Sequence, residues 1–178
     1  MNVAQHFQKM GAAFTVEPMD KFQRAFTLDV QKRDNEETFI FKSPENHIIN
    51  ILQVQPKDRH LLLMVKTPEG DKHKFLCGHD ERAWFAASIP NFPGVKDVPS
   101  AKEALKPREV REIQATSRIK TKLINKRHNS TFKRQGEWFF ILMPEYLTID
   151  PKTILKNEPI QRGSGKPHIC QELVRVNG

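Results

Sequence analysis

The chain has 178 residues and a mass of 20.7 kDa, the size of one ordinary domain, with 38% hydrophobic residues and a net charge of +8. This apolar content is enough for a packed core and excludes a collagen, a coiled-coil rod and a wholly disordered chain. The longest apolar runs, 61–65 and 138–143, are far shorter than the roughly 20 residues of a spanning helix, so we expect no membrane partner.

The first predicted element is a short amphipathic helix at the N-terminus. Val3, Phe7 and Met10 recur at helical spacing, Asn2 is suited to cap the helix, and Gly11 is suited to the position just past its end.

Strands dominate the next part of the chain, up to residue 89. Alternating or β-branched runs predict strands at 25–30, 38–41, 48–54, 61–66 and 72–77, and the Pro- and Gly-containing turn 67–71 predicts a hairpin. We expect an antiparallel meander.

The second half mixes short helices with irregular segments. Residues 89–99 contain three prolines and a glycine and predict a loop. One or two helical turns are expected at 100–106, and Pro107 is suited to be the first residue of a helix that covers Arg108 to about Ser117. The apolar run 137–143 predicts a buried strand that ends at Pro144, and a short closing helix is expected through Val174.

These elements together predict one α+β domain over residues 1–178. It would comprise a mainly β half at 1–89, a loop, helix and basic arm at 90–136, and a strand, loop and closing helix at 137–178.

Positive charge is concentrated in the segment that we call the basic arm, residues 118–134. Within 113–136 there is no carboxylate, and the seven basic residues are Arg118, Lys120, Lys122, Lys126, Arg127, Lys133 and Arg134. Because its apolar residues do not gather on one stripe, we expect this arm to be extended or irregular. A field so directional predicts a polyanionic partner.

Cysteine usage and the N-terminus bear on location. Cys77 and Cys170 are too few for a disulfide framework, and the first nine residues lack the basic and apolar regions of a secretory signal. Both features predict a reducing cytoplasm with free thiols.

Three groups of residues together carry a resemblance that covers the chain from about Lys9 onward. They are 59–63 with 75–82 and Trp84-Phe85; the run 134–140; and 157–160 leading into Arg162-Gly163 and 165–168. In this combination the chain resembles a group of uncharacterised bacterial proteins. The resemblance implies a folded bacterial protein, and it brings no catalytic assignment, cofactor or metal.

The basic arm is the first candidate site. Aligned cations contact phosphates, Phe132 and Trp138 flank them as candidate stacking surfaces, and the polar residues of 125–131 are suited to phosphate and sugar. The competing interpretation is a solvated loop that only keeps the protein soluble. For Trp84, Phe85 and most of the other paired aromatics, core packing is the expected role.

A glycine-containing turn is the second candidate. Gly163 and Gly165 allow backbone N–H groups to converge on an anion, and Arg162 and Lys166 add charge just before an expected helix start at Pro167. The spacing is not that of a Walker loop. The alternative is an ordinary surface turn.

An enzymatic alternative rests on His168 and Glu172. On the expected closing helix they share a face at i and i+4, as a base and its orienting carboxylate or as metal ligands, with Asp80 or Glu81 as further acidic groups. The competing interpretation is an ordinary His–Glu pair on a surface helix. A zinc site from Cys77, His79, His168 and Cys170 is disfavoured, because each pair has a single intervening residue. We therefore predict no metal and no cofactor.

The sequence thus favours a module that binds nucleic acid or another polyanion through the phosphate backbone. Two alternatives remain, which are a phosphodiesterase or nuclease-like enzyme centred on His168 and Glu172, and a scaffold that docks an acidic protein.

Overall fold

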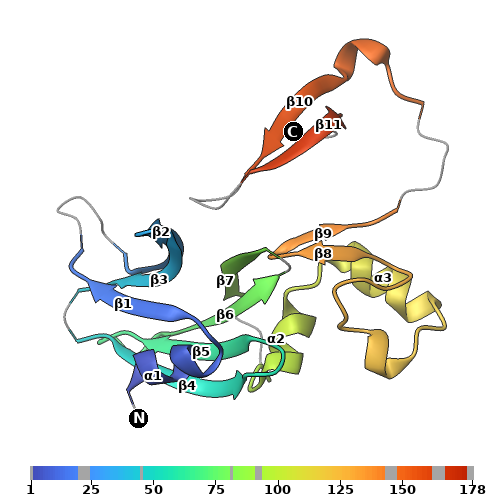
Figure 1. The fold of residues 1–178 in the computed structure, drawn as a ribbon. Coiled ribbons are helices and arrows are strands. Elements are labelled where there is room, and N and C mark those ends of the chain that lie inside the picture. The colour runs from blue at the N-terminus through green and yellow to red at the C-terminus, as the bar shows by residue number, and fades with distance from the viewer. Residues whose placement is uncertain are drawn as a thin grey trace. The chain divides into compact units, whose positions relative to one another are not determined.

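A computed structural model describes residues 2–19, 25–44, 46–80, 82–90, 94–142, 148–161 and 167–175 (Figure 1). The chain groups into two compact units, Met1–Ile141 and Leu142–Gly178, and each is treated by itself. The α+β fold class is confirmed, with antiparallel sheet concentrated in the N-terminal half and a few short helices.

The first unit is built around a four-stranded antiparallel meander in the order β4-β5-β6-β7. Its strands are β4 (Ile48–Gln55), β5 (His60–Lys66), β6 (Lys72–Asp80) and β7 (Ala83–Ile89). The expected hairpin between β5 and β6 is confirmed, with Gly70 at a φ of +97° in its turn. The meander itself is confirmed for these strands.

A second, smaller sheet has the order β1-β3-β2. It consists of β1 (Ala13–Glu17), β2 (Thr27–Arg33) and β3 (Glu36–Lys42), and β1 runs parallel to β3. We expected only antiparallel pairing, so this parallel pair is a difference. The helix α1 (Val3–Lys9) precedes β1, with Asn2 forming the capping box with Gln5 and Gly11 at a φ of +79°, as the sequence predicts.

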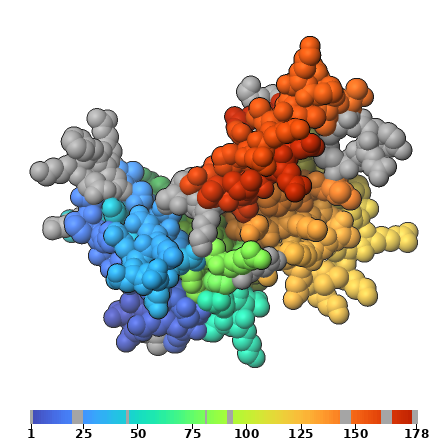
Figure 2. Space-filling view, turned by 45° about the horizontal axis from the view of Figure 1, so that its top comes forward, coloured from blue at the N-terminus to red at the C-terminus, as the bar shows by residue number. Residues whose placement is uncertain are grey.

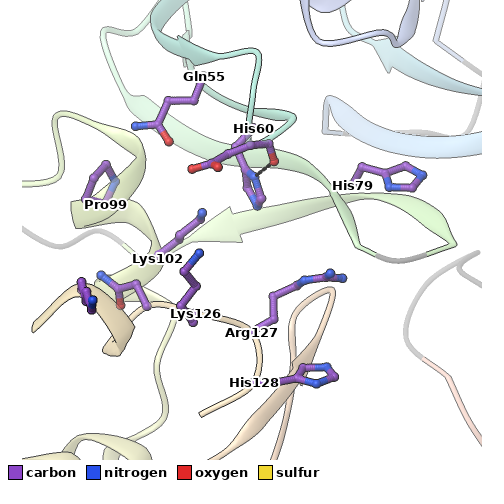
Figure 3. A pocket seen from close by; sticks show the side chains of 11 residues that line it. Gln55, His60, His79, Pro99, Lys102, Lys126, Arg127 and His128 are labelled. Carbon is purple, nitrogen blue, oxygen red and sulfur yellow. Dashed lines mark hydrogen bonds between the residues drawn. The ribbon is translucent and has the colours of Figure 1, made fainter. Parts of the chain in front are cut away.

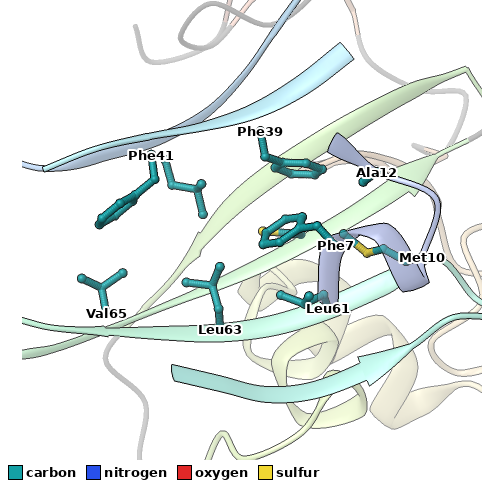
Figure 4. Packing of buried hydrophobic residues seen from close by; sticks show 10 residues of the cluster. Phe7, Met10, Ala12, Phe39, Phe41, Leu61, Leu63 and Val65 are labelled. Atoms are coloured by element: carbon teal, nitrogen blue, oxygen red, sulfur yellow. The ribbon is translucent and has the colours of Figure 1, made fainter. Parts of the chain in front are cut away.

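The main core lies between the two sheets. Because side chains alternate along β5, Leu61, Leu63 and Val65 all point to one face of the meander. Figure 4 shows Phe39 and the α1 residue Phe7 lying over this face. A packed apolar layer therefore joins α1 and the small sheet to the meander.

The opposite face of the meander is covered by α2 (Val98–Ala104), which begins at the N-cap Asp97. Val98 and Ala101 pack there against Leu62 of β5 and Leu76 of β6. The helix α3 (Arg108–Thr116) follows, with Pro107 at its N-cap, so both helices expected in this region are confirmed.

The basic arm follows α3 as an irregular loop, as expected, with a 3-10 turn, η1 (Thr121–Leu123), and the strand β8 (Lys133–Gln135). The adjoining strand β9 (Trp138–Phe140) pairs with β8 through a turn at Gly136. The prediction of a buried strand over 137–143 is wrong in length and in burial. Phe140 is 40% exposed and Leu142 is 95% exposed, and within the described residues the β8–β9 pairing ends at Phe140, since a two-stranded ribbon by itself buries little.

The second unit contains the 3-10 turn η2 (Pro151–Thr153) and an antiparallel pair, β10 (Leu155–Ile160) and β11 (His168–Leu173). The prediction of a closing helix is therefore wrong. The run His168-Ile169-Cys170-Gln171-Glu172-Leu173 has too few residues for a stable isolated helix, and pairing with β10 satisfies its backbone instead. None of the helices in the described part of the chain is long and apolar enough to cross a membrane.

Candidate anion-binding cleft

A cleft of about 630 Å³ opens in the first unit, between the meander, α2 and the basic arm (Figure 3). We call it the basic cleft. Its lining residues are Gln55, Asp58, His60, His79, Pro99, Lys102, Lys122, Asn125, Lys126, Arg127 and His128. These residues come from the β4–β5 turn region, the ends of β5 and β6, the first turns of α2 and the middle of the basic arm.

Asp80 attaches the basic arm to the meander. Leu76, Gly78 and Asp80 share one face of β6, the face that α2 covers, since strand side chains alternate. The Oδ2 atom of Asp80 accepts a hydrogen bond from the Gly136 N–H at 2.5 Å. Its Oδ1 atom lies 3.5 Å from Arg134 Nη2 and 3.7 Å from Arg127 Nη1. Strand β8 and the loop before it are therefore held at the end of β6.

The charges in this attachment are buried, and their pKa values reflect it. Burial raises the pKa of Asp80, and the neighbouring Arg134, Gly136 N–H and Arg127 oppose that rise without cancelling it. Burial also lowers the pKa of Arg134, which nevertheless stays charged because a guanidinium does not lose its proton in proteins. The ion pair thus compensates only part of the desolvation of its partners.

Asn129 organises the interior of the basic arm. Its Nδ2 group donates to the Lys126 carbonyl at 3.1 Å, and its Oδ1 atom accepts from the Thr131 N–H at 2.9 Å and the Phe132 N–H at 3.2 Å. The Asn129 side chain therefore provides hydrogen bonds that the backbone would provide in a regular helix or strand. The arm is a hydrogen-bonded loop with a defined course.

A second link braces the arm against α3. Gln114 on α3 donates from Nε2 to the Ile124 carbonyl at 2.9 Å and to Thr131 Oγ1 at 3.3 Å, and it accepts from Lys106 Nζ at 2.7 Å. Lys106 is buried and also pairs with Glu103 at 2.5 Å. A buried ammonium with two partners explains how a lysine sits inside this unit.

His60 lies on the β5 side of the cleft in a defined tautomer. Its Nδ1 atom lies 2.5 Å from the Asp58 carbonyl oxygen, which only accepts, so Nδ1 carries the proton and donates. Burial lowers the pKa of His60 to about 4, with Lys102 adding to the effect, so the ring is neutral at pH 7. The remaining nitrogen, Nε2, is a buried acceptor with no hydrogen-bond partner among the described residues.

Gly78 makes room for this histidine. A Cβ atom at position 78 would lie 2.7 Å from His60 Cδ2 and 2.8 Å from the Phe85 ring, so any larger residue would displace one of them. His60 pairs with Gly78 across the β5–β6 ladder, and its ring packs edge-on against Phe85. A glycine inside a strand is a recognised sign of close approach, and it is the signal by which sequence reasoning could have found His60.

Cations outnumber carboxylates in the cleft. Lys102, Lys122, Lys126 and Arg127 line it, whereas Asp58 is the single carboxylate among the lining residues. Burial lowers the pKa of Lys102, and repulsion from Arg134 adds to this effect. A group of cations that repel one another at the edge of a cleft is stabilised by a bound anion.

The structure divides the seven predicted cations into two groups. Arg134 is buried and Arg127 is half-buried, and both lie beside Asp80, so Arg134 serves the attachment rather than a ligand. The remaining five are exposed, and they are Arg118, Lys120, Lys122, Lys126 and Lys133. In the space-filling view the gold-coloured part of the chain that includes this arm forms an open surface with extended side chains (Figure 2).

The aromatic residues near the arm are mostly structural. Phe132 is buried and packs edge-on against Phe139 at 5.1 Å, so its expected role as a stacking surface is wrong. Trp84 and Phe85 pack against the two core clusters, as predicted. Trp138 is half-buried on β9.

The proposed catalytic pair does not assemble as expected. His168 and Glu172 lie on strand β11, where four residues span about 13 Å, far beyond hydrogen-bond distance. The anion-binding turn with Arg162, Gly163, Gly165 and Lys166, and also Glu81, lie outside the described residues. Within the described ranges, no group of three or more His, Cys, Asp or Glu side chains is placed to hold a metal ion.

Sequence reasoning missed the side of the cleft that the meander and α2 form, where Asp58, His60 and Lys102 lie. Each is an ordinary residue in its local context, and only the fold brings them opposite the basic arm. No protein family matches this chain, and no curated protein or solved structure is significantly similar to it.

Proposed function

We propose that this chain binds nucleic acid through the phosphate backbone, at the basic cleft and the exposed cations of the basic arm. The observation that supports this most strongly is the cleft itself, with its four cations and its single lining carboxylate. Burial lowers the pKa of Lys102 and repulsion from Arg134 adds to this effect, and a bound phosphate would relieve the repulsion. The hydrogen bonds of Asn129 and Gln114 support the same proposal, because they hold the arm in one conformation before binding.

The number of exposed cations sets the expected salt dependence. If the five exposed cations of the basic arm contact phosphates, the logarithm of the binding constant falls against log salt with a slope of about −4.5 for duplex DNA and about −3.5 for a single strand. Fluorescence anisotropy of labelled single- and double-stranded oligonucleotides at several salt concentrations measures this slope. A slope near zero, or no binding in dilute buffer, contradicts the proposal.

Paired variants assign the binding to the cleft. Lys122→Ala combined with Lys126→Ala removes two lining cations, whereas Lys9→Ala combined with Lys72→Ala removes the same charge from exposed positions that do not line it. We expect the first variant to bind at least tenfold more weakly and the magnitude of its salt slope to decrease by about 1.4 to 1.8. The second should resemble the wild type. Equal losses in both would show that only net charge matters.

The same assay separates the other candidate functions. A scaffold for an acidic protein would be displaced by polyglutamate as readily as by nucleic acid, whereas we expect oligonucleotides to compete far better at equal charge. Gels of the same samples test for cleavage, and we expect intact strands.

We further propose a cytoplasmic location, which the free thiols of Cys77 and Cys170 support.

A further inference from the structure

The Nε2 atom of His60 is a buried acceptor without a protein donor among the described residues, and this points to a specific kind of ligand group. Buried polar atoms in proteins nearly always have a hydrogen-bond partner, and His60 Nε2 has none among the described residues. Since Nδ1–H already donates to the Asp58 carbonyl, Nε2 presents a lone pair and needs a donor. His60 is 5% exposed and lines the basic cleft.

A phosphate group alone does not meet this need. At neutral pH a phosphodiester has only acceptor oxygens, which suit the ammonium groups of Lys102, Lys122 and Lys126. A complementary ligand therefore carries an anion and, close to it, a hydroxyl or N–H donor.

The ribose of RNA has this combination in every nucleotide, because its 2′-hydroxyl is a donor adjacent to the 3′-phosphate, and DNA lacks it. We propose that the basic cleft selects RNA over DNA, with His60 Nε2 accepting a hydrogen bond from a ribose 2′-hydroxyl while the surrounding lysines bind the neighbouring phosphate. This inference rests on the proposed function of the cleft and specifies its ligand.

The arrangement of the side chains permits such an approach. Figure 3 shows the His60 ring extending from β5 toward the ends of Lys102 and Lys126. Lysine side chains have four rotatable bonds, so their ammonium groups can reorient around a phosphate that arrives beside the ring. The ring itself is held by Asp58, Gly78 and Phe85 and is positioned before the ligand arrives.

The test uses the full chain and three labelled single strands of one sequence, which are RNA, 2′-fluoro RNA and DNA. The 2′-fluoro sugar keeps the RNA-like pucker but has no donor, so it separates the hydroxyl from the shape of the strand. We expect 2′-fluoro RNA and DNA to bind about three- to tenfold more weakly than RNA. Equal affinity of RNA and 2′-fluoro RNA overturns the inference and leaves the proposed function intact. Failure of all three strands to bind overturns the proposed function itself.

Variants then assign the discrimination to His60. His60→Phe keeps a planar ring without an acceptor, and we expect it to bind RNA and 2′-fluoro RNA equally. His73→Phe, at an exposed position that does not line the cleft, should retain the wild-type preference. Circular dichroism and thermal melting verify that both variants fold, and the comparison of strands on the wild type needs no variant at all. Persistent RNA preference in folded His60→Phe places the hydroxyl contact elsewhere and overturns the inference.

Discussion

The buried carboxylate of Asp80 lies 3.5 Å from the buried guanidinium of Arg134, and this contact joins the end of β6 to β8. The same carboxylate accepts from the Gly136 N–H in the β8–β9 turn. Through these contacts a loop that carries most of the excess charge of the chain is held against a rigid sheet. The position of the cleft depends on this attachment.

Asp80→Asn should destabilise the first unit strongly. Although the raised pKa of Asp80 indicates a costly burial, removal of its charge leaves Arg134 buried without a counter-ion. Breaking a buried pair in this way costs about 3 kcal/mol in the free energy of unfolding. Urea denaturation measures the loss, with Asp71→Asn at an exposed turn position as the control. A loss below about 1 kcal/mol would show that Arg134 finds another partner.

His60 should make stability depend on pH in a defined window. Its pKa is about 4 in the folded protein against 6.5 in the unfolded chain, so between these values the unfolded chain binds more protons. The contribution of His60 is therefore complete above pH 6.5 and is lost as the pH falls toward 4, by about 3 kcal/mol in all.

Denaturation curves at several pH values for the wild type and His60→Phe test this dependence. Because other groups titrate in the same range, the quantity to follow is the difference between the two proteins. The free energy of unfolding of the wild type minus that of His60→Phe should increase as the pH rises from 4 to 6.5. Parallel pH profiles would contradict the assignment of a neutral, buried His60.

Gly78→Ala should displace the His60 or Phe85 ring and destabilise the first unit. The new methyl group would lie 2.7 Å from His60 and 2.8 Å from Phe85, so one ring must shift. Overpacking of this kind costs about 1 to 3 kcal/mol in the free energy of unfolding. The double variant Gly78→Ala with Phe85→Leu should recover part of the loss beyond additivity, since the smaller side chain makes room. Strict additivity would argue against a steric clash with Phe85.

Asn129→Ala should loosen the basic arm without unfolding the sheet. The variant loses the hydrogen bonds from the Thr131 and Phe132 N–H groups and to the Lys126 carbonyl. We expect faster amide hydrogen exchange at residues 123–132, weaker binding to nucleic acid and a loss of about 1 to 2 kcal/mol. Ser130→Ala, at an exposed neighbouring position, is the matched control. Unchanged exchange in Asn129→Ala would mean that other contacts hold the loop.

Local patterns in the sequence determined most of the first unit. The helical spacing of Val3, Phe7 and Met10, the cap at Asn2 and the hairpin around Gly70 each act over a few residues, and the structure confirms them. The sequence predicts Pro107 as the first residue of the next helix, and the structure places it one position earlier, at the N-cap. The concentration of cations between Arg118 and Arg134 is likewise visible without a fold. Such features are determined by propensity and periodicity, which need no distant partner.

Tertiary structure alone decided which of these residues meet. Pairing with β10 made β11 a strand and separated His168 from Glu172, and a buried carboxylate at Asp80 took Arg134 out of the exposed basic surface. His60 became part of a cleft because β5 and α2 place it opposite the basic arm. The physical reason is that strand pairing and burial depend on residues far away in the chain, whose contacts leave no local pattern.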